Sequence, residues 1–234
     1  MIVSLLKQDI RFQFRHGFYY AYLLVTVIYI VLLLALPESI QSYLTTLIIF
    51  SDPATLGFFF IGAILLLERH QQLLTYLFVT PVRLIPFLLA KLLSLFLISV
   101  LTSIIIVMVV MGLAVSYWQL ALALLLTSVF FTMCGIFIAV RTQSLNAFLV
   151  RAILVMIVLY LPLVSYFELW SHPLMQIFPV YSSLFLLRGA IQGGLNLSDT
   201  PFWLHTGMLM IWNAILFYLT YQRFKRSIIA SQGD

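Results

Sequence analysis

The sequence predicts an all-α polytopic membrane protein with six transmembrane helices in a single domain over residues 1–234. Its 234 residues are 64% hydrophobic and 8% charged, whereas a soluble domain carries roughly 25% charged residues. Apolar runs of about 18 or more residues recur along the chain, and each is long enough to cross a hydrocarbon core of about 30 Å. The length leaves no room for a second, soluble domain of ordinary size.

Polar interruptions divide the apolar runs into the expected spans. Before the first span, residues 1–18 mix apolar with basic residues, which is typical of an amphipathic helix in the membrane interface; a plain positively charged flank is the alternative. This start is unlike a cleavable signal peptide, because no small-residue cleavage site follows the first apolar run. The six expected spans are 19–36, 44–67, 86–115, 120–140, 147–167 and 202–221.

Residues 168–201 break the pattern with prolines, glycines and polar side chains. Two apolar pieces within this segment, 174–178 and 180–190, are too short to span a membrane. We expect them to form short re-entrant or interfacial helices at the outer face, where non-helical backbone is tolerated if the protein buries it.

The basic residues predict the orientation. Lys and Arg stay on the cytoplasmic side of a membrane protein, so the net charge of +5 does not indicate nucleic-acid binding. The six-span plan puts eleven of the twelve Lys and Arg on one side and leaves Arg188 on the other. Both termini and the segment 68–85 are therefore expected in the cytoplasm. The eleven are Lys7, Arg11, Arg15, Arg69, Arg83, Lys91, Arg141, Arg151, Arg223, Lys225 and Arg226.

The segment 68–82 is the longest polar interruption in the first half of the chain. Leu73, Leu74, Leu77 and Phe78 recur at a spacing that places them on one face of a short helix. Thr80-Pro81 ends this helix, because proline disfavours the helical conformation of the residue before it. An amphipathic helix between two spans is expected to dock onto another protein.

The sequence lacks the common signatures of catalysis and metal binding. It contains no G-x-x-x-x-G-K-[ST] to hold nucleotide phosphates and no G-x-S-x-G nucleophile motif. His16, His70, His172 and His205 lie in four separate regions, which does not favour a metal site. Cys134, the single cysteine, lies in an apolar run and excludes an intramolecular disulfide. We therefore expect neither an enzyme nor a cofactor-binding chain.

Asp52 is the ionisable residue that stands out inside an expected span. An intramembrane carboxylate is a functional-site hypothesis by default. The competing interpretation is a helix cap, since Asp before Pro53 is a favourable N-cap with proline at the first helical position. The cap is the expectation, in which case Asp52→Asn would be nearly silent.

With the segment 68–82 on the cytoplasmic side, the chain resembles an ABC-2-type transporter permease. Members of this family carry acidic and basic residues, a Leu-rich helix, Thr-Pro-Val and a later Ala/Gly-Lys-Leu; Gln71-Gln72 departs from the usual Gly and second Glu. A second, looser motif lies near the end. The matching residues are Glu68-Arg69, Leu73-Leu74, Leu77-Phe78-Val79-Thr80-Pro81-Val82, Ala90-Lys91-Leu92, Pro179-Val180-Tyr181 and Leu187-Arg188-Gly189, with Gly193.

The resemblance implies a bacterial inner-membrane exporter subunit that pairs with a separate ABC ATPase, which would bind ATP and Mg, and with a second permease, identical or homologous. It implies a pathway between the two permeases; the candidates are Asp52, Phe58, Phe59 and Tyr160, although core packing explains the aromatic ones equally well. The implied ATPase-coupling residues are Glu68, Arg69, Leu73, Leu74, Leu77, Phe78, Thr80 and Pro81.

Two other classes of function stay open at this stage. An ion-coupled secondary transporter would be expected to show internal repeats or discontinuous charged helices, and neither is evident in the sequence. A non-transport membrane scaffold or enzyme has no residue constellation in its favour.

Overall fold

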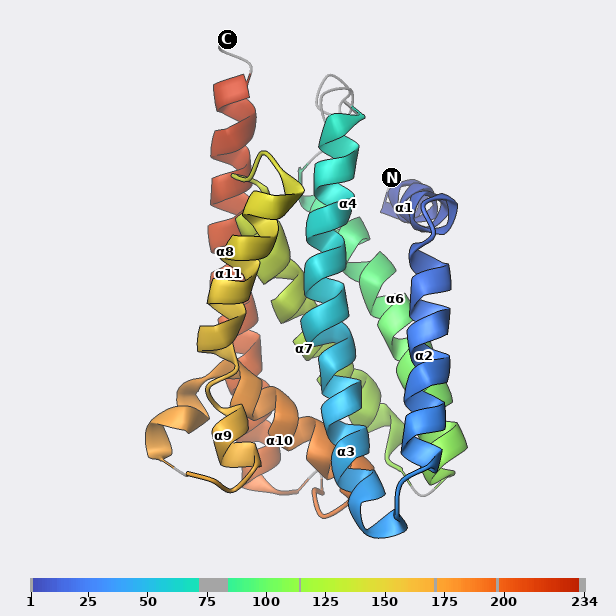
Figure 1. The fold of residues 1–234 in the computed structure, drawn as a ribbon. Helices are drawn as coiled ribbons and strands as arrows, with labels where there is room; N and C mark the ends of the chain where they lie inside the picture. Colours follow the sequence, from blue (N-terminus) through green and yellow to red (C-terminus); the bar gives the residue numbers. More distant parts are fainter. Residues whose placement is uncertain (1, 72–83, 114, 171, 197, 232–234) are drawn as a thin grey trace.

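The computed structural model describes residues 2–71, 84–113, 115–170, 172–196 and 198–231. Within these residues every regular element is a helix and there is no strand, which confirms the all-α class. The helices form an elongated bundle, and α1 and the C-terminal end of α11 lie at the same end of it (Figure 1). We call this end the terminal end and the other the distal end.

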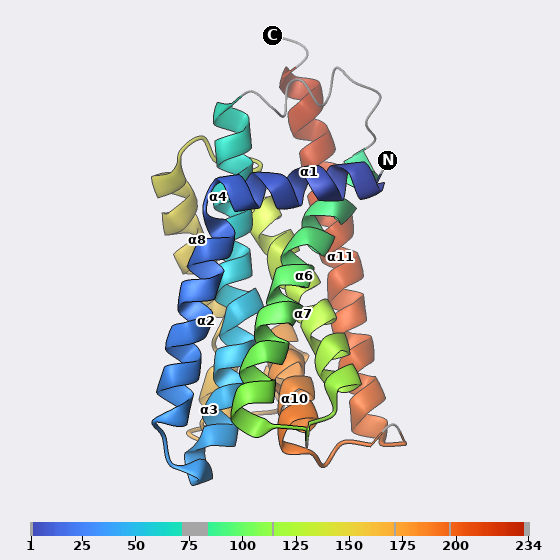
Figure 2. The ribbon, with the colours of Figure 1, turned by 90° about the vertical axis from the view of Figure 1, so that its right-hand side faces the viewer.

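The N-terminal amphipathic segment forms a helix that is separate from the first span. Helix α1 (Ile2–Arg15) lies across the terminal end of the bundle and makes an angle of 68° with α2 (Phe18–Leu34) (Figure 2). Gly17 makes this turn with φ +82°, a left-handed conformation that glycine adopts without steric cost. Although α1 is amphipathic, its buried residues are the polar Asp9 and Gln13.

The second expected span lies inside a longer helical run. Helix α3 (Glu38–Ser51) passes without a break into a π-helix, η1 (Asp52–Gly57), and then into α4 (Phe58–His70). The N-cap interpretation of Asp52 is therefore wrong. Its backbone is helical, with φ −63° and ψ −62°, and its N–H donates to the carbonyl oxygen of Ile48, whereas an N-cap residue has a non-helical conformation.

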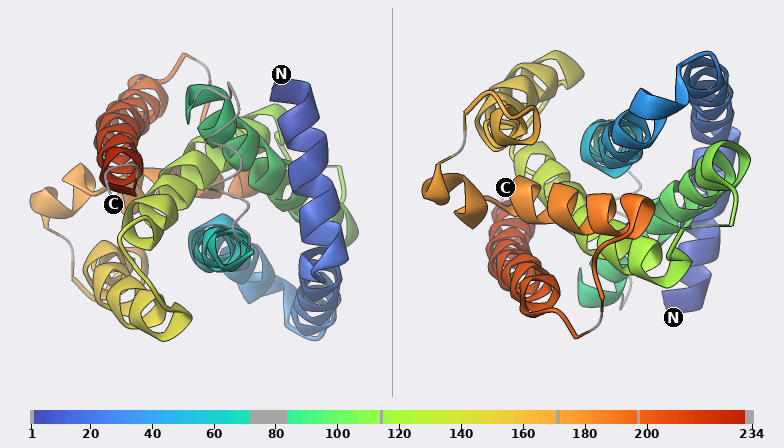
Figure 3. Two further views of the ribbon diagram at one scale, coloured as in Figure 1. Left: turned by 90° about the horizontal axis from the view of Figure 1, so that it is seen from above. Right: turned by 90° about the horizontal axis from the view of Figure 1, so that it is seen from below.

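Helices α6 (Leu84–Met111) and α7 (Tyr117–Ala139) form the centre of the fold. In the apolar stretches of α7, α6 and α11, 67%, 44% and 22% of the residues are buried, so α7 is the central helix and α11 the most peripheral of the three. The views along the bundle show α7 surrounded by the other helices, with α10 (Pro179–Gln192) lying across its distal end (Figure 3).

The fifth expected span, 147–167, forms a shorter helix. Helix α8 (Leu145–Leu159) has 15 residues, or about 22 Å of helix rise. It ends before Pro162, whose missing N–H cannot continue the helical hydrogen bonds. The one-turn helix α9 (Leu163–Tyr166) and the 3-10 helix η2 (Pro173–Ile177) follow, and they lead into α10. The last helix, α11 (Thr200–Ser231), extends well past residue 221.

In the described part of the chain, three helices are long and apolar enough to cross a membrane: Leu84–Met111, Tyr117–Ala139 and Thr200–Arg226. The bent pair α1 and α2 makes a fourth if it counts as one span. The chain is therefore a multi-pass membrane protein, and the number of six spans stays a prediction.

Candidate functional site

Several polar contacts lie at the terminal end of the bundle, close to the residues that flank the expected docking segment. The last turn of α4 carries Glu68 and Arg69, and α4 is followed after Gln71 by residues 72–83, which lie outside the described residues. Helix α6 begins at Leu84. Segment 72–83 therefore joins α4 to α6 in the chain.

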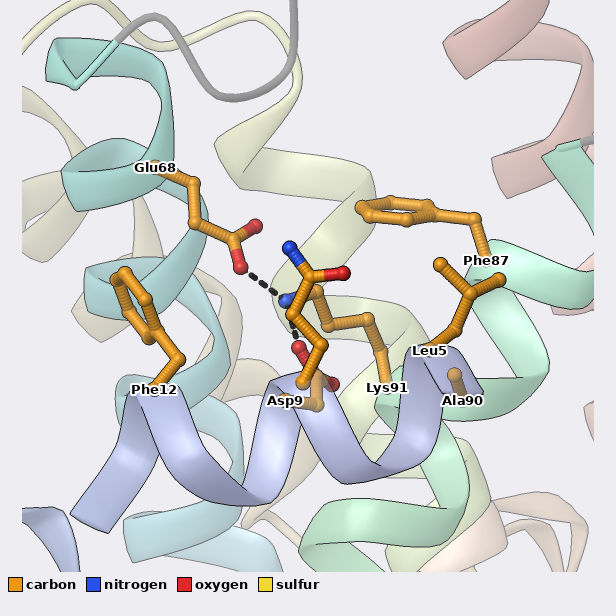
Figure 4. Close-up of a pocket in the computed structure, with 8 residues that line it drawn as sticks. Leu5, Asp9, Phe12, Glu68, Phe87, Ala90 and Lys91 are labelled. Atoms are coloured by element: carbon orange, nitrogen blue, oxygen red, sulfur yellow. Dashed lines mark hydrogen bonds and ion pairs between the residues drawn. The ribbon is translucent and has the colours of Figure 1, made fainter. Parts of the chain in front are cut away.

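A buried ion triad ties three helices together at this end. The ammonium of Lys91 on α6 forms ion pairs with the carboxylates of Asp9 on α1 and Glu68 on α4 (Figure 4). Lys91 is 1% exposed, and both carboxylates are also buried. These residues come from three regions of the sequence, and their side chains converge on one point.

The triad continues into a hydrogen-bond network along α1. The Ser94 hydroxyl, one turn after Lys91, donates to Asp9 Oδ2 at 3.0 Å, and Gln13 Nε2 donates to Ser94 Oγ at 2.8 Å. Asp9 and Gln13 are four residues apart and share one face of α1. Asp9 and Gln13 thus lie on the side of α1 that packs on α6, whereas the basic residues Lys7, Arg11 and Arg15 are exposed.

The triad carries one cation for two carboxylates. Breaking a buried ion pair by removing one partner costs about 3–5 kcal/mol, because an unpaired charge is left behind. Lys91 is the single basic residue of α6, so nothing else on that helix would neutralise Asp9 and Glu68. A pocket of about 30 Å³ borders the triad, between Leu5 and Phe12 of α1 and Phe87 of α6 (Figure 4).

Arg69 binds the connection between α7 and α8. Its Nη1 donates to the carbonyl oxygen of Thr142 and its Nη2 to that of Val140, each at 2.8 Å. Helix α7 ends at Ala139, and the last carbonyls of a helix have no partner within the helix and favour a cation. Arg151 of α8 reaches the same turn, at 3.3 Å from the carbonyl oxygen of Arg141. The planar guanidinium suits such a double contact better than a lysine would.

The structure places the expected coupling residues in two groups. Glu68 and Arg69 make contacts within the chain itself, to Lys91 and to the turn after α7. Their expected contact with a partner protein is not tested by these internal contacts and stays a prediction. The other coupling residues lie outside the described residues: Leu73, Leu74, Leu77, Phe78, Thr80 and Pro81.

The pathway candidates lie along the α3–η1–α4 run and at the end of α8. Phe58 is fully buried, and its ring lies 5.4 Å from that of Phe59 and 6.2 Å from that of Phe148. Tyr160 follows the last residue of α8, with its ring 5.8 Å from that of Phe50. In this conformation Phe58 is part of the core. Phe58 and Phe59 are consecutive residues of α4, and Asp52 lies on the same helical run.

Sequence reasoning missed the partners of Glu68. Lys91 is one of the basic residues expected on the cytoplasmic side, and in the structure it is buried in an ion triad. Its position offered a signal, because a lone cation in a strongly apolar helix needs a buried counter-charge. The choice of Asp9, 82 residues away, required the packing of α1 on α6. No group of three or more metal-binding side chains occurs among the residues that the structure describes.

The sequence is similar to known export permeases over most of its length. The model of the fluoroquinolones export permease protein family matches residues 1–232. The chain belongs to this family. It is 26% identical over 190 residues to a fluoroquinolones export permease protein of Mycobacterium tuberculosis, recorded for strains CDC 1551 and H37Rv. Those residues cover 81% of this chain and 80% of the relative. The membership identifies the chain as a membrane export permease.

Proposed function

We propose that this chain is the transmembrane subunit of an ATP-driven exporter of the ABC-2 type, with six spans and both termini in the bacterial cytoplasm. The observation that carries the export function is the family match over residues 1–232. ATP and Mg would be bound by a separate ABC ATPase. The segment 68–82 of this chain would dock onto that ATPase. The chain itself then performs no hydrolysis.

The polar contacts of α4 support the coupling role. Glu68 is bound to Lys91 at the start of α6, and Arg69 is bound to the turn after α7. A movement of segment 68–82 would therefore reach α1, α6 and α7 through side chains that are already engaged. Buried interactions of this kind transmit displacement because close-packed interiors deform little.

The apolar surface supports assembly with a second permease in the membrane. Helix α8 exposes a band of large apolar side chains that face either lipid or a partner; they include Val150, Ile153, Leu154, Ile157 and Val158. We propose that an identical or homologous permease packs along this side, with the pathway between the two copies. Phe59 and Tyr160, both only partly buried, would then lie near the pathway.

The names of the relatives suggest the cargo, and we propose that fluoroquinolones are exported. The test is the accumulation of a fluorescent fluoroquinolone in cells that express the chain with its ATPase. We expect lower accumulation than in cells whose ATPase carries a disabled P-loop. Equal accumulation in the two strains would contradict export of this cargo.

Assembly with the ATPase is tested separately from the cargo. Purification of the permease with its candidate ATPase should give a stable complex whose ATP hydrolysis exceeds that of the ATPase alone. A complex without fluoroquinolone export would retain the coupling proposal and overturn only the cargo. Export that persists with no P-loop protein present would favour the ion-coupled alternative.

A further inference from the structure

Asp52 is a buried carboxyl that the export function leaves unexplained. It is 2% exposed and begins the π-helix η1 between α3 and α4. Its Oδ2 lies 2.8 Å from the Thr102 hydroxyl of α6. Single π-helical turns within longer helices occur frequently at functional sites. The position therefore combines an unusual backbone with an unusual side chain.

Among the described residues of the elements around Asp52, every basic side chain lies far along its helix from this residue. The sequences of α2, α3, η1 and α7 contain no Lys, Arg or His. On α6 the one basic residue is Lys91, three turns from Thr102, or about 16 Å along the helix, and it is already shared by Asp9 and Glu68. On α4 the basic residues Arg69 and His70 are confined to the last turn.

The titratable groups near Asp52 cannot neutralise a negative charge. Tyr22 of α2 is buried and interacts electrostatically with Asp52, and Tyr29 of α2 contacts Ser51 at 3.3 Å. Helix α7, which packs on η1, carries the buried Cys134. A phenol or a thiol carries either no charge or a negative one, so none of the three can serve as a counter-ion. An ionised carboxylate buried without a cation is strongly disfavoured, and such a group takes up a proton instead.

The hydrogen bonds around Thr102 accommodate that proton. The hydroxyl lies 3.0 Å from the carbonyl oxygens of Ile98 and Ser99, in addition to its contact with Asp52. A hydroxyl has one hydrogen to donate and two lone pairs to accept with. If Thr102 donates to a carbonyl of its own helix, the hydrogen in the contact with Asp52 must come from the carboxyl group.

We propose that Asp52 is a proton-binding site, which in this conformation is occupied: the neutral carboxyl donates its hydrogen to Thr102 Oγ1, and Thr102 donates to the helix backbone. Releasing the proton leaves a carboxylate that needs new donors. Further buried hydroxyls stand within one turn of Thr102: that of Ser99, which already lies close to Asp52, and that of Ser103, which has no partner; the Tyr22 hydroxyl is likewise unpartnered. A shift of η1 toward these donors would accompany deprotonation.

The site is independent of the cargo and of the ATPase, and it is testable on the purified permease. Infrared difference spectra recorded between mildly acidic and alkaline pH report protonated carboxyls through their C=O stretch. We expect a protonated-acid band in the wild type that is lost at alkaline pH and is absent in Asp52→Asn. Asparagine matches the neutral acid in shape and can donate to Thr102, so this variant should remain folded. The exposed Glu38 of α3 provides the matched control Glu38→Gln, which should retain the band.

Thr102→Val tests the geometry of the site. It removes the acceptor of the proposed hydrogen bond, so the Asp52 band should move to higher wavenumber while its pH sensitivity persists. Acid-band spectra that are identical in the wild type and Asp52→Asn at every pH would overturn the proton site. A band that responds to sodium at constant pH would also overturn it, in favour of a metal-cation site.

Discussion

Arg69 at the end of α4 donates a hydrogen bond of 2.8 Å to the carbonyl oxygen of Thr142, just beyond the end of α7. A second bond of the same length reaches Val140. One side chain thus joins the end of α4 to the end of α7, and its two acceptors are 71 and 73 residues away in the sequence. Arg69 belongs to the start of the segment 68–82, which is expected to dock onto an ATPase, so this segment starts from a fixed point.

Arg69→Leu should lower the stability of the permease modestly. The carbonyls of Val140 and Thr142 would lose their donors, and both residues are buried although Arg69 itself is exposed. We therefore expect a loss of about 1–3 kcal/mol, the cost of leaving a buried acceptor without its donor. Chemical unfolding in detergent measures it. Arg69→Lys should recover part of the loss, and a Leu variant as stable as the wild type would show that the contacts contribute nothing.

Lys91→Met should be strongly destabilising, because it leaves the carboxylates of Asp9 and Glu68 buried without their cation. We expect a loss of about 3–5 kcal/mol in the free energy of unfolding. The triple variant Asp9→Asn/Glu68→Gln/Lys91→Met removes all three charges and should recover most of it. Wild-type stability of the single Lys91→Met variant would contradict the triad. Equal loss in the single and triple variants would show that shape, not charge, determines the effect.

Gly135→Ala should disrupt the packing of α7 against α4. A Cβ at this position would lie 2.3 Å from Ile61 Cγ2 and 2.6 Å from the carbonyl oxygen of Phe58, and the latter belongs to the backbone and cannot turn away. Overpacking of this kind costs about 1–3 kcal/mol. Gly207→Ala on α11 is the matched control, since nothing lies within 4 Å of its Cβ. A lower thermal transition is expected for Gly135→Ala alone.

The charge distribution predicts the orientation in the membrane. The segments that carry most of the basic residues, namely α1, the end of α4, the α7–α8 turn and the end of α11, lie at the terminal end, whereas α10 with Arg188 lies at the distal end (Figure 1). Reporters fused after Arg141 should therefore be cytoplasmic, and reporters after Asn196 external. A cytoplasmic signal at Asn196 would contradict the six-span plan.

The sequence predicts the helices better than it predicts the contacts between them. Apolar runs determine helices such as α6 and α7, because burial of an apolar side chain depends little on its partner. The break at Pro162 shortened the fifth helix through a local effect that a count of apolar residues overlooks. The ion pair of Asp9 with Lys91 depends on how α1 packs on α6. The π-helix η1, which begins at Asp52, depends on how this turn packs against its neighbouring helices. Neither leaves a periodic pattern in the chain.

We propose that the segment 68–82 docks onto the ATPase through the apolar face of its helix. Co-purification of the ATPase with the permease tests this docking. Burial of a Leu or Phe side chain contributes about 1.5–3 kcal/mol, and a carboxylate in its place would bury an unpaired charge. Leu77 belongs to this face, and Thr75 to the opposite, polar one. We predict that Leu77→Asp loses the ATPase while the permease stays inserted and folded, and that Thr75→Asp retains it. Stoichiometric ATPase bound to the Leu77→Asp permease would contradict the claim.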